Sequence, residues 1–297
     1  MKNKISHQGL FALTALILTL CGVILLTLCY LSAYDVAIGY FSADSLLPLL
    51  GTLFALLFTL GITGGAILLY RKDGKELTLH DPLWFRTVSA LVGIGFLAMA
   101  LTDLKASASL LPVLVGAMAA IHFLIRALKP TLHLPLVLTG IFVIVRLALA
   151  IGQLYFNWEI PMNAPVKIYL QLGAVAGMVF LLREWKATVV PSHSLLTPIA
   201  LGLGTLFTGL SSLPILIARQ KGALGEIAIS PVPFLLFLLW IYCLARMLTL
   251  FRAPEATAEE PVAESEGDTE ATAKSEADPL AESENDLPSE ESETDPS

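Results

Sequence analysis

The chain has 297 residues, of which 56% are hydrophobic and only 14% are charged. Soluble domains are about a quarter charged and slightly under half apolar, whereas here the apolar residues gather in runs of about 20, the length that crosses a bilayer. This composition excludes a soluble globular enzyme, a secreted disulfide-stabilised module and a nucleic-acid-binding domain.

Eight apolar runs predict eight transmembrane helices, so the expected fold class is an all-α integral membrane protein with its helices in a bundle. Each run has about 17 to 25 residues, and a helix satisfies its own backbone hydrogen bonds in hydrocarbon. The first run is about 22 residues long, longer than the apolar core of a cleaved signal peptide, so we expect a retained anchor. Within a membrane domain over residues 1–252, the predicted spans are 10–31, 46–70, 84–101, 109–128, 134–154, 166–182, 195–217 and 232–251.

The seventh predicted span, 195–217, is the richest in small residues. Lipid tails are as apolar as leucine, so helices in a bilayer associate largely where small side chains let their backbones approach. Gly202, Gly204 and Gly209 lie in this span. We therefore expect it to be the most buried helix of the bundle.

The basic residues of the short loops predict the orientation. With a cytoplasmic N-terminus, twelve Lys and Arg residues fall on the cytoplasmic side and four on the other, and Arg146 lies inside a span. This bias follows the positive-inside rule, and eight crossings then place both termini in the cytoplasm. A short basic N-terminus and the lack of any N-x-S/T acceptor favour the plasma membrane of a bacterium.

Residues 253–297 form a strongly acidic tail. They hold 16 Asp and Glu residues and one lysine, while residues 1–252 hold 17 basic and 9 acidic residues. The tail has no aromatic residue, so it cannot bury enough apolar surface to offset its ordering entropy, and we expect disorder. It is either a solvated extension or a docking segment for a basic protein partner.

The predicted ligand site centres on Arg146, because a charge inside a span is costly and commonly marks function. Gln153 and Asn157 follow at i+7 and i+11, on the same helix face, and Gln171 lies in the next span. Together they predict a cationic cleft between the fifth and sixth helices for an anionic small molecule or lipid headgroup. In the alternative interpretation, Arg146 extends toward the surface and is satisfied by Gln153, backbone carbonyls or Glu159.

Other polar residues give weaker signals. His122 and Arg126 share a helix face; we interpret Arg126 as an interfacial anchor and His122 as a structural histidine rather than a proton-sensitive group. No predicted span contains Asp or Glu, and Asp103 and Glu184 are expected in loops. Proton- and sodium-coupled carriers generally use membrane carboxylates, so this pattern disfavours such coupling.

No motif indicates catalysis, a metal or a cofactor. There is no HExxH, GxSxG, P-loop or dinucleotide fingerprint, and the three cysteines lie singly in apolar runs. The leading hypothesis is therefore a non-catalytic accessory, assembly or regulatory membrane component. A permease or carrier using Arg146 is the first alternative, and an intramembrane enzyme without a recognisable motif is the second.

Overall fold

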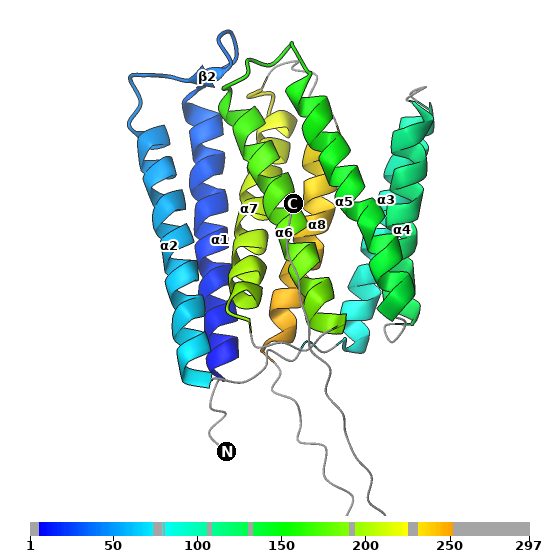
Figure 1. The fold of residues 1–297 in the computed structure, drawn as a ribbon. Coiled ribbons are helices and arrows are strands. Elements are labelled where there is room, and N and C mark those ends of the chain that lie inside the picture. The colour runs from blue at the N-terminus through cyan, green and yellow to red at the C-terminus, as the bar shows by residue number, and fades with distance from the viewer. Residues whose placement is uncertain are drawn as a thin grey trace, which may run out of the picture. The chain divides into compact units, whose positions relative to one another are not determined.

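The computed structural model describes residues 6–73, 79, 81–105, 109–129, 133–189, 194–224 and 231–251 (Figure 1). Within these residues the chain forms eight long helices, each apolar enough to cross a membrane. The helices are α1 His7–Ser32, α2 Leu47–Asp73, α3 Leu83–Lys105, α4 Leu110–Leu128, α5 His133–Tyr155, α6 Pro165–Val189, α7 Leu196–Gln220 and α8 Val232–Thr249. The prediction of an eight-helix membrane bundle is confirmed, and the acidic tail, 253–297, lies outside the described residues.

A small hairpin between α1 and α2 contains the only β-strands in the described part of the chain. Its strands are β1 Tyr34–Asp35 and β2 Tyr40–Phe41, which pair antiparallel. Gly39 adopts a φ of +73°, a conformation that favours glycine. Consecutive helices run in opposite directions (Figure 1), so this hairpin marks one end of the bundle, which we call the hairpin end.

α3 and α6 extend well past their predicted spans, and this overturns the expectation that the spans lack carboxylates. α3 continues to Lys105 and so contains Asp103, while α6 continues to Val189 and contains the fully buried Glu184. The apolar runs end at the first charged residues, but a helix can continue past them where its charges find partners within the bundle. Asp103 and Glu184 are therefore helical residues, not loop residues.

The bundle is organised around α7, which packs against α1, α2, α6 and α8. In its most apolar window 72% of the residues are buried, compared with 17% for α2 at the edge of the bundle. An added Cβ at Gly204 would lie 2.7 Å from Phe180 of α6, and one at Gly209 would lie 2.6 Å from Trp240 of α8. The expectation that the seventh helix is the most buried is thus confirmed, for the packing reason given by its small residues.

α3, α4 and α5 form the other side of the bundle (Figure 1), and α4 packs against both α3 and α5. This group joins the rest of the protein through contacts of α3 with α8 and of α5 with α6. Most of the polar contacts described below join α3, α4 or α5 to one another or to α6 and α8.

Candidate functional site

Arg146, the centre of the predicted site, is buried in the middle of α5 and paired with a residue that we had placed in a loop. Its Nη2 donates to Oδ2 of Asp103 on α3 over 3.0 Å, and the Arg146 side chain is only 3% exposed. An added Cβ at Gly116 of α4 would lie 3.9 Å from Nε of Arg146. The guanidinium therefore passes beside a glycine of α4 to reach α3.

The other predicted site residues do not gather around this guanidinium. Gln153 is exposed, and Asn157 and Gln171 are partly buried. The Asn157 side chain accepts a hydrogen bond of 2.9 Å from the backbone N–H of Glu159. Among the described residues, Arg146 bonds Asp103 and neither Gln153 nor Gln171. The alternative interpretation, in which Gln153 or Glu159 binds the Arg146 side chain, is not found among the described residues either.

At the opposite end from the hairpin, three helices and the segment just before α3 bring together a group that sequence reasoning missed. We call Asp81, Arg126, Glu184, Tyr242 and Arg246 the ionic cluster. Nε of Arg246 lies 2.6 Å from Oε1 of Glu184, and its Nη1 lies 2.7 Å from Oδ1 of Asp81. Nη2 of Arg126 lies 3.4 Å from both carboxylates, and the Tyr242 hydroxyl donates to Glu184 over 2.8 Å.

The cluster balances its charges, since it contains two guanidinium groups and two carboxylates. Burial opposes ionisation of Asp81, but the nearby Arg246 and Arg126 outweigh it and hold the Asp81 pKa below its ordinary value. The Phe85 ring of α3 covers the cations, with its centroid 3.8 Å from the guanidinium carbon of Arg246. Such stacking of a cation on an aromatic face is attractive and strongest away from water.

His122 lies one turn before Arg126 and is fully buried. Its Nδ1 is 3.0 Å from the carbonyl oxygen of Leu136, and its ring meets the edge or face of Phe123 and Trp185. This bond to a carbonyl makes Nδ1 the protonated nitrogen. A bond between His122 and a serine, which would support a hydrolase, does not occur among the described residues; Ser212 instead donates to the Thr208 carbonyl at 2.6 Å.

Two further cations are satisfied by backbone carbonyls. Nζ of the buried Lys167, at the start of α6, lies 3.1 to 3.5 Å from the carbonyl oxygens of Tyr155, Asn157 and Ile160. It therefore holds the end of α5 and the following loop to α6. At the other end, Nε of Arg86 donates to the Ala127 carbonyl over 2.7 Å, near the end of α4.

These contacts make the polar groups of the bundle a set of internal links. The cluster could have been found in the sequence only by pairing charges at neighbouring span ends, where Asp81, Arg126, Glu184 and Arg246 all occur. Within the described residues no group of three or more His, Cys, Asp or Glu side chains is placed to hold a metal ion. Comparisons with known protein families, with curated proteins and with solved structures give no match.

Proposed function

We propose that this multi-pass membrane protein is a non-catalytic accessory, assembly or regulatory component of a bacterial plasma membrane, with both termini in the cytoplasm. The observation that carries the proposal is the use of its buried charges. The described residues contain five buried Lys, Arg or Glu side chains, and each contacts an opposite charge or a backbone carbonyl of the same bundle.

This arrangement favours a scaffold over a transport pathway. Buried ion pairs contribute little net stability but penalise strongly any packing that separates them, so they specify one arrangement of helices. A membrane component that presents its surface to partners needs such a fixed bundle. The acidic segment 253–297 then supplies an electrostatic contact for a basic protein partner, with an attraction that weakens at high salt.

The test is purification of the full chain in mild detergent, with mass spectrometry of the proteins that accompany it. A matched variant keeps the tail length but carries Asn or Gln at its 16 acidic positions. We expect a basic partner that the wild-type chain retains at low salt and the neutral-tail variant loses. If both chains retain the same proteins, or neither retains any, the docking role of the tail is wrong.

A carrier for an anionic solute or headgroup is the second candidate, and one observation favours it. In the described part of the chain, Nη1 of Arg146 is buried without a hydrogen-bond partner. An anionic oxygen would satisfy this donor. Uptake of a dicarboxylate into proteoliposomes that is lost in Arg146→Gln, but kept in Lys105→Gln at the exposed end of α3, would establish the carrier and displace the scaffold proposal.

A further inference from the structure

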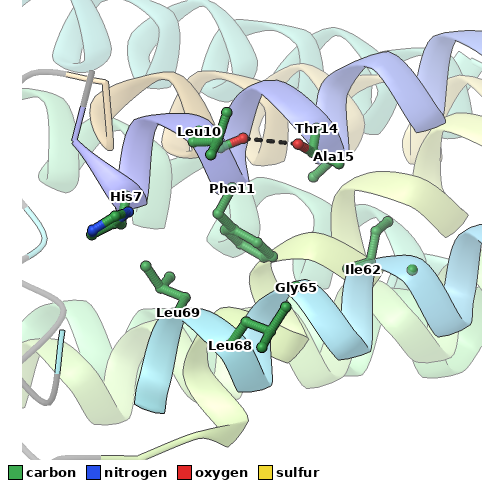
Figure 2. A pocket seen from close by; sticks show the side chains of 10 residues that line it. His7, Leu10, Phe11, Thr14, Ala15, Ile62, Gly65, Leu68 and Leu69 are labelled. Atoms are coloured by element: carbon green, nitrogen blue, oxygen red, sulfur yellow. Dashed lines mark hydrogen bonds between the residues drawn. The ribbon is translucent and has the colours of Figure 1, made fainter. Parts of the chain in front are cut away.

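A cavity opens between α1 and α2 at the end of the bundle opposite the hairpin (Figure 2). Its volume is about 180 Å³. α1 contributes residues from its first three turns, and α2 contributes residues from its last three or four. The lining residues are His7, Leu10, Phe11, Thr14, Ala15, Gly61, Ile62, Gly65, Leu68 and Leu69.

The wall of this cavity is almost entirely apolar. The Thr14 hydroxyl donates to the Leu10 carbonyl over 3.0 Å, as the dashed line in Figure 2 shows, so this polar group is already occupied. His7, at the first turn of α1, is the one titratable group among the lining residues. A ligand deep in the cavity would therefore meet hydrocarbon surface.

Two glycines of α2 leave the space open. An added Cβ at Gly65 would lie 3.4 Å from the Phe11 ring, and one at Gly61 would lie 3.5 Å from Leu18. The adjacent Gly64 differs, because an added Cβ there meets nothing within 4 Å. Gly65 thus borders the cavity, while Gly64 provides a neighbouring position outside it.

The surroundings and the volume of the cavity indicate the kind of ligand it can hold. Leu10 and Leu68 at its rim are 54% and 60% exposed on membrane-spanning helices, so the medium at the opening is lipid. An apolar cavity of about 150 Å³ takes up benzene. A space of 180 Å³ therefore accommodates a stretch of roughly six carbons from an acyl chain.

The charge at the mouth favours an anionic headgroup. Arg71 is exposed near the end of α2, two residues beyond the cavity-lining Leu69. His7, at the first turn of α1, lines the cavity at the same end of the bundle. Basic residues at a membrane surface attract anionic lipids.

We propose that the groove between α1 and α2 is a binding site for one acyl chain of an anionic phospholipid, whose phosphate lies at the basic mouth beside His7 and Arg71. The site is distinct from the ionic cluster and from the Arg146–Asp103 pair. It does not depend on whether the protein is an accessory component or a carrier.

The test is native mass spectrometry of the full-length protein, released from vesicles of equal parts phosphatidylglycerol and phosphatidylcholine. Gly65→Leu fills the groove, and Gly64→Leu is the matched control with the same gain in helix propensity. We expect the wild type and Gly64→Leu to retain phosphatidylglycerol. Gly65→Leu should retain about tenfold less, the factor that corresponds to losing contact with roughly two methylene groups.

Thr14→Phe fills the same groove from α1, so the proposal remains testable if Gly65→Leu does not fold. Equal phosphatidylglycerol retention by the wild type and a folded groove-filling variant would overturn the site. Equal retention of the two lipids by the wild type would overturn the anionic headgroup.

Discussion

At the end opposite the hairpin, charged side chains from three helices and from the segment before α3 meet in one cluster, whereas toward the hairpin end Arg146 and Lys167 each have separate partners. The cluster joins α4, α6 and α8 to Asp81, which lies two residues before α3. Arg146 is linked to α3 alone, and Lys167 is linked to the nearby chain at the end of α5. Buried charges are therefore stabilised by a shared network at one end of the bundle, and by separate contacts of single side chains toward the other end.

This contrast has an energetic consequence. Removing one member of a buried pair leaves an uncompensated charge, which commonly costs about 3–5 kcal/mol. In the cluster, Glu184 contacts both guanidinium groups and the Tyr242 hydroxyl, so its loss affects several partners at once. Changes in the cluster should therefore weaken the whole bundle, and changes toward the hairpin end should act more locally.

The largest effect is expected for Glu184→Gln. This change leaves two buried cations near Asp81 alone, and we expect it to lower the free energy of unfolding by about 3–5 kcal/mol. Denaturant unfolding in detergent micelles measures this loss, and the exposed Glu159→Gln provides the control. A loss as small as that of Glu159→Gln would show that the cluster does not hold the helices together.

A double change tests whether the cluster acts as a unit. Glu184→Gln combined with Arg246→Gln should cost clearly less than the two single changes added together, because each single change leaves the other charge without compensation. The same unfolding measurement gives this coupling. Additive costs would mean that the two side chains act independently despite their 2.6 Å contact.

Arg146→Met should have a smaller effect, about 2 kcal/mol. It removes one ion pair, and the remaining Asp103 is 13% exposed, so its carboxylate can recover some hydration. Asp103→Asn added to Arg146→Met should restore part of the loss. Measured stability that falls further in the double variant would contradict the pairing as the source of the effect.

Lys167→Met should cost about 1.5 kcal/mol, through loss of the ammonium group from three carbonyl oxygens. Hydrogen–deuterium exchange should accelerate over residues 156–164 and remain unchanged around Glu184. Lys105→Met, at an exposed position of α3, is the control. Faster exchange across all eight helices would show that this contact is not local.

The smallest effect expected is the pH dependence that Asp81 adds. Its pKa is lowered in the folded protein, so it binds a proton less readily there than in the unfolded chain. Its contribution to stability is complete above the ordinary value of 3.8 and is lost as the pH falls through the lower folded pKa. The unfolding temperature of the wild type should therefore fall more steeply below pH 4 than that of Asp81→Asn; parallel curves would refute this.

The helices could be predicted because each satisfies a local requirement, namely enough apolar length to cross the membrane and no unsatisfied backbone group. The most buried helix could also be predicted, since glycines such as those in 195–217 allow neighbouring helices to pack closely. The partners of Arg126 and Arg146 could not, because Glu184 and Asp103 lie 58 and 43 residues away in the sequence. Which helix ends meet is decided by the packing of the whole bundle, and apolar runs carry no information about that choice.

The order of biosynthesis gives the ionic cluster a further significance. Translation proceeds from the N-terminus, so Asp81, Arg126 and Glu184 are made before Arg246 on the last helix. A chain that stops before Val232 has Glu184 without its closest cation and without the Tyr242 hydroxyl. Until the last helix is made and inserted, the two carboxylates Asp81 and Glu184 have only Arg126 to balance their charge. An incomplete chain therefore carries an excess negative charge at this end of the bundle.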